Sequence, residues 1–447
     1  MRVILLSGGS GKRLWPLSNE IRSKQFIKFF KTEGGYESMV QRVYNQIKTV
    51  DSSIDISIAT SKSQVSSIYN QLGDKVTISV EPCRKDTFPA IALAVAFLHD
   101  VQNVSKNEVI VVCPVDPYVE EDYYETVKKM GEYASLGNTN IVLMGIKPTY
   151  PSEKYGYIIP KNDFFCSEVS SFVEKPSTDC AKKLIKKGAL WNGGVFAFKC
   201  GYLLDLCERL LGTSQYKEMI LNYKSYKSIS FDYAVVEKED ATTVLRFDGK
   251  WMDIGSWNTL VNVMSESIIG DATTDSECSN THIINELDIP ILAMGIKDII
   301  VSASPDGILV SEKGRSDYIK PFVERIQGDV RFAEKSWGCF KVIDVEENGL
   351  TIKVTIKAGD SMNYHSHSHR DEVWIVVSGN GETVLDGIYK TVKSGDVITI
   401  PVGCKHTIRA ITELVMIEVQ IGKDISVHDK QKHELPLPSS NDENRLE

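Results

Sequence analysis

The chain begins with the stretch Met1-Arg-Val-Ile-Leu-Leu-Ser-Gly-Gly-Ser-Gly-Lys-Arg-Leu-Trp-Pro-Leu-Ser18. Its apolar residues Val3 to Leu6 predict a short buried strand, and a tight turn follows. That turn contains three glycines, Gly8, Gly9 and Gly11. Glycines let backbone N–H groups approach phosphate oxygens without a clash at Cβ, and the nearby Arg13 and Lys24 can neutralise phosphate charge. The stretch therefore predicts a loop that binds a nucleoside triphosphate.

The glycine spacing departs from the two commonest nucleotide-binding motifs. Residues 8–13 lack the G-x-x-x-x-G-K-[ST] pattern of a P-loop, and the glycines do not fit G-x-G-x-x-G. A glycine-rich turn after a core strand is the structural alternative. The adjacent Arg13 and the rigid Trp15-Pro16 pair favour phosphate binding.

Composition and charge place the chain among globular proteins. Its 447 residues predict about two to three domains, and 42% apolar with 25% charged residues is ordinary. A net charge of −9 argues against nonspecific nucleic-acid binding. We expect no membrane span, because no apolar run reaches about 18 residues, and no secretory leader precedes the first strand. Nine cysteines without C-x-x-C spacing predict reduced, mostly buried thiols in a cytoplasmic protein.

Strand and helix patterns alternate along residues 1–260. This alternation predicts an α/β domain whose mostly parallel sheet is covered by helices on both faces. Ligands then gather at the carboxyl ends of the strands. The expected strands are Val3–Leu6, Ile54–Ala59, Thr77–Val80, Glu108–Cys113 and Ile141–Ile146. The expected helices are Glu37–Thr49, Ser63–Leu72, Pro89–Val101 and Asp122–Ser135.

The pattern changes after residue 260. Short β-rich pieces along 261–330, such as Ile299–Ser302, predict a small connecting β domain. Residues 331–428 carry strand patterns separated by turns, which suit a small jelly-roll barrel. Residues 429–447 are polar and charged and predict a disordered tail.

Further motifs follow the glycine turn in a fixed order. They are Lys24-Gln25-Phe26, Glu81-Pro82, Thr87 with Pro89-Ala90-Ile91, Pro148 with Tyr155-Gly-Tyr-Ile158, Phe172-Val-Glu-Lys-Pro176, Trp191-Asn-Gly-Gly-Val-Phe196, Phe231-Asp-Tyr-Ala234 and Trp251-Met-Asp-Ile-Gly-Ser-Trp257. This ordered set resembles the nucleotidyltransferase signature of mannose-1-phosphate guanylyltransferases (GDP-mannose pyrophosphorylases). The resemblance covers residues 1–260 and implies a Rossmann-like nucleotidyltransferase domain.

The resemblance implies that GTP and mannose 1-phosphate give GDP-mannose and diphosphate, through in-line attack of a phosphate oxygen on the α-phosphorus. Because the attacking oxygen is already ionised, the reaction needs cations, positioned donors and a metal ion. Asp116 and Asp253 would hold Mg²⁺, which prefers hard oxygen ligands. A turn residue at Asp116 and a cap at Asp253 are the structural alternatives. Many relatives have Asp-His where this chain has Asp116-Pro117.

The resemblance also assigns the substrate contacts. Glu174 and Lys175 would contact the sugar phosphate, Asn192 would bond a sugar hydroxyl, and Gly156 would allow close approach of the hexose. A solvated charge pair is the alternative for Glu174 and Lys175. With the glycine turn, Glu81 and Asp86 would bind the nucleotide. Asp86 could accept from guanine N–H groups or cap the helix expected near Pro89, so other bases and other hexose or heptose 1-phosphates stay open.

A second constellation lies near the end of the chain, in the pattern Gly359-x₅-His365-Ser-His367-x₄-Glu372-x₆-Gly379 followed by His406. His365 and His367 are two residues apart, so on a strand both would point to the same face. Three imidazoles and a carboxylate suit Zn²⁺, Mn²⁺, Fe²⁺ or Ni²⁺. A histidine-rich surface turn is the alternative, and His369 fits it. The pattern resembles the two motifs of the cupin barrel.

Guanylyltransferases of this type are often fused to a cupin with mannose-6-phosphate isomerase activity. Three departures count against that activity here: His365 stands where Gln is usual, Ala410 replaces an Asn, and residues 423–428 lack the usual arginine. An isomerase site needs a base, a metal and phosphate-binding cations, and the sequence identifies only the metal ligands. The cupin is alternatively a dimerisation or sensing module, and we expect the enzyme to be a homo-oligomer, specifically a dimer.

Overall fold

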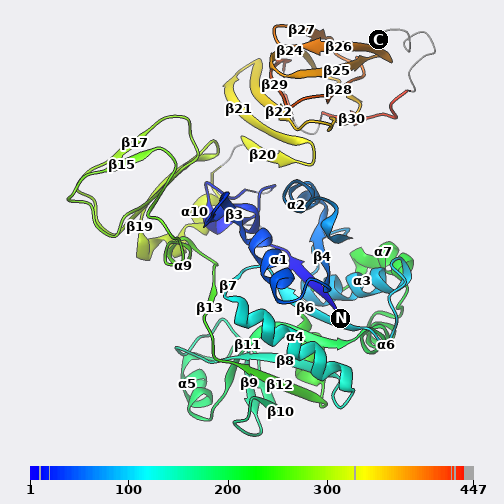
Figure 1. Cartoon of the computed structure of the whole chain (residues 1–447), viewed down its shortest axis with the longest axis vertical. Helices are drawn as coiled ribbons and strands as arrows, with labels where there is room; N and C mark the ends of the chain where they lie inside the picture. Colours follow the sequence, from blue (N-terminus) through cyan, green and yellow to red (C-terminus); the bar gives the residue numbers. More distant parts are fainter. Residues whose placement is uncertain (10–11, 20, 327–328, 424, 427–428, 437–447) are drawn as a thin grey trace. The chain divides into compact units, whose positions relative to one another are not determined.

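The computed structural model describes residues 1–9, 12–19, 21–326, 329–423, 425–426 and 429–436 (Figure 1). The chain forms two compact units. The N-terminal unit contains Met1–Leu14, Ser23–Ser267 and Glu312–Ile319, and the C-terminal unit contains Trp15–Arg22, Ile268–Ser311 and Lys320–Glu447. Each unit therefore includes a short segment from the other's part of the sequence.

A nine-stranded mixed sheet forms the centre of the N-terminal unit, in the order β5-β4-β1-β6-β11-β8-β12-β10-β9. β1 pairs in parallel with β4 and β6, whereas β11 runs antiparallel to β6 and β8, and β10 antiparallel to β12. The strands are β1 (Arg2–Ser7), β4 (Asp55–Ser61), β5 (Thr77–Glu81), β6 (Val109–Pro114), β8 (Ile141–Ile146), β9 (Tyr157–Pro160), β10 (Cys166–Val173), β11 (Leu190–Lys199) and β12 (Thr242–Phe247).

Helices cover both faces of this sheet, since Val109 to Cys113 of β6 are all buried. α4 packs on β6, β8 and β11, and α3 packs on the β1, β4 and β5 side with α6, α7 and α8 (Figure 1). The helices are α1 (Met39–Val50), α2 (Val65–Leu72), α3 (Thr87–Asp100), α4 (Glu121–Leu136), α5 (Thr178–Lys186), α6 (Cys200–Leu211), α7 (Tyr216–Asn222), α8 (Phe231–Ala234) and α9 (Trp257–Val261). The predicted α/β architecture is confirmed, but the prediction of a mostly parallel sheet is wrong, because β9, β10 and β11 pair antiparallel.

Two small strand pairs complete the N-terminal unit. β2 (Lys28–Thr32) and β3 (Gly35–Ser38) form a hairpin. β7 (Pro117–Val119) pairs with β13 (Trp251–Asp253), so residues far apart in sequence become neighbours at the carboxyl end of β6. This second pairing positions the candidate site described below.

The C-terminal unit contains two kinds of β-structure. Residues 268–312 form short strands that pair in parallel, β14 with β16, β16 with β18, and β15 with β17. Their bounds are β14 (Ile268–Ile269), β15 (Ala272–Thr274), β16 (His282–Asn285), β17 (Ile291–Ala293), β18 (Ile299–Ser304) and β19 (Gly307–Glu312). We call residues 268–311 the β module. Residues 312–319 return to the N-terminal unit, so the β module is shorter than the connecting domain predicted over 261–330.

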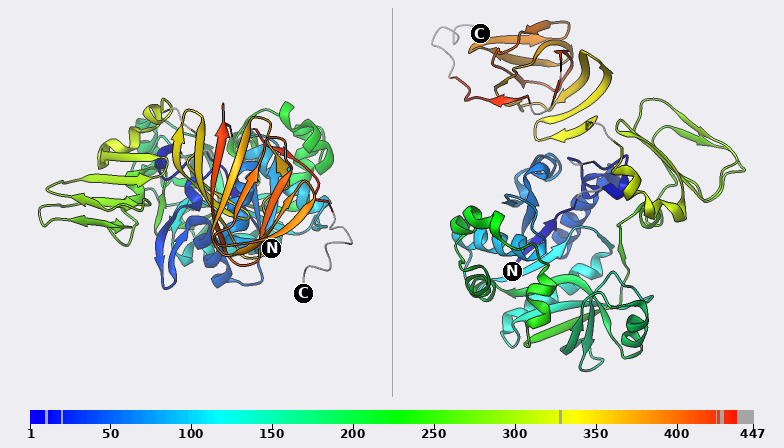
Figure 2. Two further views of the ribbon diagram at one scale, coloured as in Figure 1. Left: turned by 90° about the horizontal axis from the view of Figure 1, so that it is seen from above. Right: turned by 180° about the vertical axis from the view of Figure 1, so that it is seen from behind.

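The remaining strands form two facing antiparallel sheets, the barrel predicted from the sequence (Figure 2). One sheet has the order β20-β21-β22-β29-β24-β27 and the other β26-β25-β28-β23-β30. Their bounds are β20 (Phe332–Lys335), β21 (Gly338–Glu346), β22 (Gly349–Ile356), β23 (His365–Ser366), β24 (Arg370–Ser378), β25 (Asn380–Leu385), β26 (Ile388–Lys393), β27 (Val397–Ile400), β28 (His406–Ala410), β29 (Leu414–Gly422) and β30 (Gln431–Lys432). Between the sheets lies an apolar core that includes Trp374, Ile408 and Met416.

The prediction of a disordered tail from residue 429 is wrong for residues 429–436. Gln431 and Lys432 form β30 and pair with His365 and Ser366. The Tyr389 hydroxyl donates to the Pro436 carbonyl. Polar composition suggested disorder, but backbone pairing with a buried strand fixes this segment; residues 437–447 lie outside the described part of the chain.

The cysteines are free thiols of mixed burial. All nine fall within the described residues, none forms a disulfide, and Cys113, Cys200, Cys207 and Cys404 are buried while the others are half-buried. Across the described residues, no helix has the length and apolar character needed to cross a bilayer.

We predict that Gly338→Ala lowers the stability of the barrel by about 2 kcal/mol or more. Gly338 has a φ of +150°, and a Cβ there would lie 1.9 Å from the Thr355 carbonyl oxygen, so the backbone must shift. Gly395→Ala is the matched control, because Gly395 also has a positive φ, +91°, but nothing within 4 Å of its Cβ position. Thermal unfolding of both variants measures the effect, and equal losses would contradict the steric argument.

Candidate functional site

A buried polar network supports the turn that follows β1. Ser7 Oγ donates to Gln64 Oε1 at 3.0 Å, Gln25 Nε2 donates to Ser7 Oγ at 3.0 Å, and Gln64 Nε2 donates to Ser23 Oγ at 2.7 Å. Ser23 Oγ in turn donates to the Gly9 carbonyl at 3.2 Å. The network connects the turn to the segment that carries Lys24, so the two parts of the predicted phosphate loop are joined.

Two of the three predicted glycines lie in the described residues. Gly8 is exposed, and Gly9 has a φ of +115° with nothing within 4 Å of its Cβ position. This left-handed backbone and open space fit a turn that a phosphate group approaches closely. Gly11 lies outside the described residues. Arg84, which the sequence interpretation did not select, donates to the Gly9 carbonyl at 3.2 Å.

The structure brings the two predicted metal-binding aspartates together. Asp253 pairs with Pro117 across β13 and β7, directly beside Asp116. Burial and then the Asp116 charge raise the pKa of Asp253, while Lys24 and Arg13 oppose that shift. Lys24 Nζ lies 3.1 Å from Asp116 Oδ2 and donates to the Ile254 carbonyl at 2.8 Å. The four residues predicted as catalytic therefore gather at one rim, as two carboxylates with two cations.

This donor set fits Mg²⁺. Two adjacent carboxylates supply the hard oxygen ligands that this ion prefers, and phosphates with water complete its shell. Asp116 is partly exposed, at 43% of its side-chain surface, so its free oxygen faces solvent. The structure thus supports binding of a divalent cation at Asp116 and Asp253 more than the turn and cap alternatives.

The predicted sugar-phosphate residues also lie together. Glu174 is buried, with 5% of its side chain exposed, and Oε1 lies 3.0 Å from Lys175 Nζ. The backbone N–H of Asn192 donates to the Gly156 carbonyl at 2.8 Å. A Cβ on Gly156 would lie 2.5 Å from Glu174 Oε2 and 2.7 Å from the Phe172 ring, so a larger residue would displace these side chains. The structure is inconsistent with a solvated Glu174–Lys175 pair, because the carboxylate is enclosed.

Glu174 Oε2 has no hydrogen-bond donor among the described residues, although it is buried. An unpaired buried carboxylate oxygen is costly. A hydroxyl group of a bound sugar can donate to this oxygen. The hydrogen bonding of this carboxylate is therefore incomplete within the described residues.

Asp232 is a site residue that the sequence interpretation missed, although its motif Phe231–Ala234 was noted. Its Oδ1 accepts from Asn192 Nδ2 at 2.5 Å. Burial, and then the Glu174 charge, raise the pKa of Asp232 to about 6. Asp232 therefore fixes the orientation of the Asn192 amide.

An aromatic cluster accompanies the aspartate pair and the sugar residues. Trp191 precedes Asn192, Trp251 lies two residues before Asp253, and their ring centroids are 6.1 Å apart. Tyr155 contacts both rings at 4.9 and 5.4 Å. Burial and then the Asp253 charge raise the pKa of Tyr155 above its usual range. These aromatic faces connect the candidate metal site with the candidate sugar site.

The two acidic residues predicted to bind the nucleotide have local structural partners. Asp86 has a φ of +72° and accepts from the Thr87 backbone N–H at 2.8 Å, so it caps α3, one of the two readings of this residue. The cap explains why α3 starts at Thr87 rather than Pro89. Glu81 ends β5 and accepts from the Tyr223 hydroxyl at 3.0 Å, and burial raises the pKa of Glu81.

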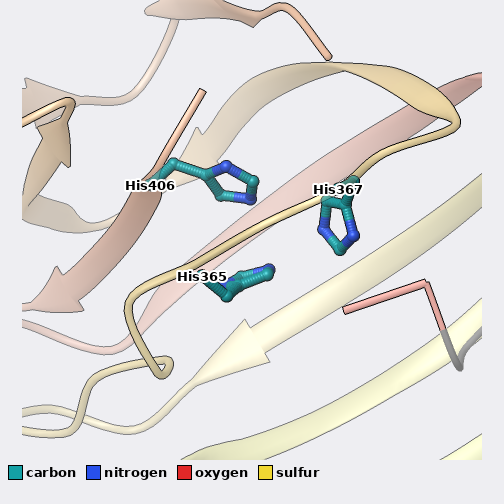
Figure 3. A group of neighbouring side chains, drawn as sticks. All are labelled: His365, His367 and His406. Carbon is teal, nitrogen blue, oxygen red and sulfur yellow. The ribbon is translucent and has the colours of Figure 1, made fainter. Parts of the chain in front are cut away.

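Three of the four predicted cupin ligands form a compact group (Figure 3). The ligand nitrogens of His365, His367 and His406 lie within 4.8 Å of one another, and all three residues are buried. Each Nδ1 lies against a backbone carbonyl: Asn363 at 2.6 Å for His365, Cys404 at 2.9 Å for His406, and Asp429 for His367. With each Nδ1 against a carbonyl, Nε2 is the nitrogen that faces the centre of the group, and His367 Nε2 accepts from Arg370 Nη2 at 3.0 Å. Burial lowers the pKa of His365 to about 2, which keeps its imidazole neutral.

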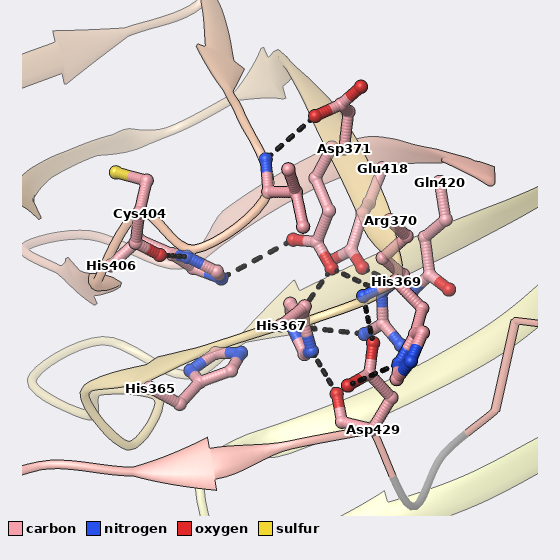
Figure 4. A network of polar contacts seen from close by, with 12 residues as sticks. His365, His367, His369, Arg370, Asp371, Cys404, His406, Glu418, Gln420 and Asp429 are labelled. Carbon is pink, nitrogen blue, oxygen red and sulfur yellow. Dashed lines mark hydrogen bonds and ion pairs between the residues drawn. The ribbon is translucent and has the colours of Figure 1, made fainter.

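Figure 4 shows the polar side chains around His367 and His406, among them Arg370. Glu372, the fourth predicted ligand, lies beside these two imidazoles. Its oxygens lie 3.1 Å from His367 Nε2 and 3.4 Å from His406 Nε2. It also accepts from Arg370 Nε at 2.9 Å and from Trp374 Nε1 at 3.1 Å. Burial raises the pKa of Glu372, but the neighbouring histidines outweigh burial and hold this pKa below its usual range. The donor set fits a transition metal with three imidazoles and one carboxylate.

A cavity of about 540 Å³ opens beside these histidines. Its lining includes His365, Lys335, Arg370, Glu418, Gln420 and Lys430. Burial lowers the pKa of Lys430 to about 8, and burial with the Glu372 charge raises that of Glu418 to about 8. The sequence interpretation assigned no role to Lys430, which fell in the predicted tail, or to Glu418, which lies in β29.

Comparison with known proteins agrees with this two-part arrangement. Residues 2–268 match the family described as Nucleotidyl transferase, and residues 328–434 match Mannose-6-phosphate isomerase C-terminal. A mannose-1-phosphate guanylyltransferase from Salmonella montevideo is 29% identical over 95% of this chain and 97% of its own length. Xanthan biosynthesis protein XanB from Xanthomonas campestris is 29% identical over 95% and 96%.

One solved structure is similar to most of the chain. It is described as mannose-1-phosphate geranyltransferase from Thermus thermophilus, with 27% identity and a TM-score of 0.61. The match covers 72% of this chain and 98% of that one. The matched residues 2–268 include every predicted catalytic and sugar-phosphate residue, and they make up more than half of the sequence. The chain therefore belongs to the nucleotidyl transferase family, and its C-terminal barrel is of the mannose-6-phosphate isomerase type.

Proposed function

We propose that this enzyme is a mannose-1-phosphate guanylyltransferase, which converts GTP and α-D-mannose 1-phosphate into GDP-mannose and diphosphate. One observation carries the proposal: two cations, two aspartates and a buried carboxylate, Glu174, whose Oε2 has no partner among the described residues, belong to one unit. The names of the full-length relatives supply the sugar and the base.

We also propose a cytoplasmic location and a homodimer. The free thiols of the cysteines support the first, and the exposed Ile308 and Val310 of β19 support the second.

The chemistry follows from charge. A phosphate oxygen of the sugar attacks the α-phosphorus of GTP in line, a P–O bond forms, and diphosphate leaves with the electron pair of the broken bond. Both reactants are anions, so Arg13 and Lys24 lower the barrier by holding positive charge beside the reacting phosphates. Asp116 and Asp253 would hold Mg²⁺, which would neutralise further phosphate charge. No protein base is required.

The sugar residues orient the attacking group. Lys175 Nζ would weaken its ion pair with Glu174 and contact the sugar phosphate. Glu174 Oε2 would accept from a sugar hydroxyl. Asn192, fixed by Asp232, would present its amide to a second hydroxyl. Holding both reactants in line converts the reaction into an effectively unimolecular step. Glu81 and Asp86 would lie at the nucleotide, beside the glycine turn.

A nucleotide-by-sugar activity matrix tests the choice of substrates. We expect diphosphate release with GTP and mannose 1-phosphate to exceed, by at least about tenfold in kcat/KM, release with ATP, CTP or UTP and with glucose 1-phosphate. A higher rate for another pair would replace these substrates with that pair. The absence of diphosphate release with every pair would contradict nucleotidyl transfer itself.

Lys24→Ala tests the catalytic cation. We expect kcat to fall by more than about tenfold with the fold intact, the scale of one lost transition-state contact. Lys28→Ala is the matched control, because Lys28 is an exposed lysine on the following strand. Steady-state kinetics with circular dichroism give the measurement, and near-normal kcat in Lys24→Ala would remove Lys24 from the mechanism.

Mannose 6-phosphate isomerisation in the barrel is the second candidate function. The cavity beside the three histidines supplies the groups that the sequence alone did not: Lys335, Arg370 and Lys430 as cations for a phosphate, and Glu418 as a carboxyl. Converting mannose 6-phosphate to fructose 6-phosphate moves a hydrogen from C2 to C1, and such a transfer needs a proton carrier near the sugar. Zn²⁺, Mn²⁺, Fe²⁺ or Ni²⁺ are the candidate metals.

His365→Ala tests the barrel site. After loading with Zn²⁺ or Mn²⁺, we expect the variant to retain less than about half of the wild-type metal, because one of three imidazoles is lost. His369→Ala is the control, since 68% of that side chain is exposed. Metal analysis and a coupled assay for fructose 6-phosphate give the readouts. Unchanged metal content would exclude the triad, and metal without isomerisation would favour a sensing or structural role.

A further inference from the structure

The segment that joins the two catalytic cations belongs to the C-terminal unit. Residues 15–22 lie in sequence between Arg13 and Lys24, yet they cluster with the β module and the barrel. Arg13 and Lys24 themselves cluster with the N-terminal unit. The placement of both cations therefore depends on a segment that other parts of the chain hold.

A buried ion pair fixes the end of this segment. Arg22 Nη1 and Nη2 donate to the two carboxylate oxygens of Glu286, at 2.7 and 2.9 Å. Only 8% of the Arg22 side chain is exposed, and its guanidinium lies 5.1 Å from the centre of the Phe332 ring. Two parallel bonds and a stacked ring restrict a guanidinium in direction as well as position. Arg22 is thus held by the β module and by the first strand of the barrel.

Contacts made by three further residues fix the remainder of the segment. Asn19 Nδ2 donates to Asp306 at 2.7 Å and to the Phe332 carbonyl at 3.0 Å. Ser304 Oγ donates to the Pro16 carbonyl at 2.7 Å. The Trp15 ring occupies the space beside Gly307, where a Cβ would lie 2.4 Å from the ring. Residues from one end of the segment to the other are therefore bound to residues beyond 280.

We propose that Arg22 is a positioning residue of the transferase site: its pair with Glu286 holds residues 15–22, and through the chain it sets Arg13 and Lys24 for the reaction. The inference rests on the proposed function. Arg22 lies in the C-terminal unit and acts only through its neighbours in sequence. The β module and β20 are consequently parts of the transferase, although they carry none of its catalytic residues.

Glu286→Gln tests the pair in the full-length enzyme. It keeps the shape of the side chain and removes the charge that Arg22 requires. We expect kcat for diphosphate release to fall about tenfold or more, with KM for GTP changed less than about threefold, because misplaced cations weaken the transition state most. Lys341→Ala is the matched control, since its ion pair with Asp288 also joins the β module to the barrel but does not involve residues 15–22.

Hydrogen exchange supplies a readout that does not depend on activity. In Glu286→Gln we expect faster exchange in peptides covering residues 15–22, and unchanged exchange in β1 and β6. If kcat falls without faster exchange there, or exchange rises with normal kcat, the positioning role is wrong. If Glu286→Gln does not fold, Asn19→Ala gives the same comparison with a milder change. A wild-type enzyme that releases no diphosphate with any nucleotide contradicts the proposed function, whereas the exchange result still reports on the pair.

Discussion

The charge balance around Asp116 and Asp253 is the constraint on which the rest of the N-terminal unit depends. Two carboxylates side by side repel each other, and burial of Asp253 makes its ionisation harder still. Lys24, bound directly to Asp116, and Arg13 reduce this cost. Pairing of β7 with β13 holds the aspartates in place, at the carboxyl end of β6. The sheet thereby fixes two neighbouring carboxylates, and a cation with its bound phosphates can balance their charge.

The barrel also contains buried polar and charged groups, but it stabilises them in a different way. Its three histidines are buried, and each Nδ1 lies against a backbone carbonyl. Charge is instead concentrated on Glu372 and Arg370, which bond to each other at 2.9 Å. A buried charge is tolerated only when paired. The two units therefore prepare for ligands differently, the first with cations near solvent and the second with an enclosed, pre-oriented set.

Local patterns predicted the elements better than the long-range contacts. The strand Ile141–Ile146 and the turn after Ser7 follow from short apolar runs and glycines, which act within a few residues. β11 was not predicted as a strand, because nothing local in Leu190–Lys199 marks it as one. Its antiparallel pairing with β6 becomes visible only in the structure. β30 was missed for a similar reason: its two polar residues are ordered only by pairing with β23.

The candidate sites divide in the same way. Histidines spaced by two predicted the metal group, because period-two spacing is a local property of strands. Asp232 and Lys430 were missed, since their roles arise from burial beside partners far away in sequence. Arg22 adjoins the quoted Lys24 motif but showed no signal of its own, because Glu286 lies 264 residues away. Residue type and spacing identify ligands, whereas supporting residues become visible only with tertiary contacts.

The shared segments also limit how this architecture can be recombined. Residues 15–22 and 312–319 each fold with the half of the chain to which they do not belong in sequence. A chimaera joined at residue 260 would combine a loop from one parent with the acidic and aromatic side chains of another, and Arg22 would meet a foreign surface. Exchange of halves between homologues therefore requires that Arg22, Glu286 and Phe332 be transferred as a set. The barrel and the catalytic loop would then have to come from the same parent.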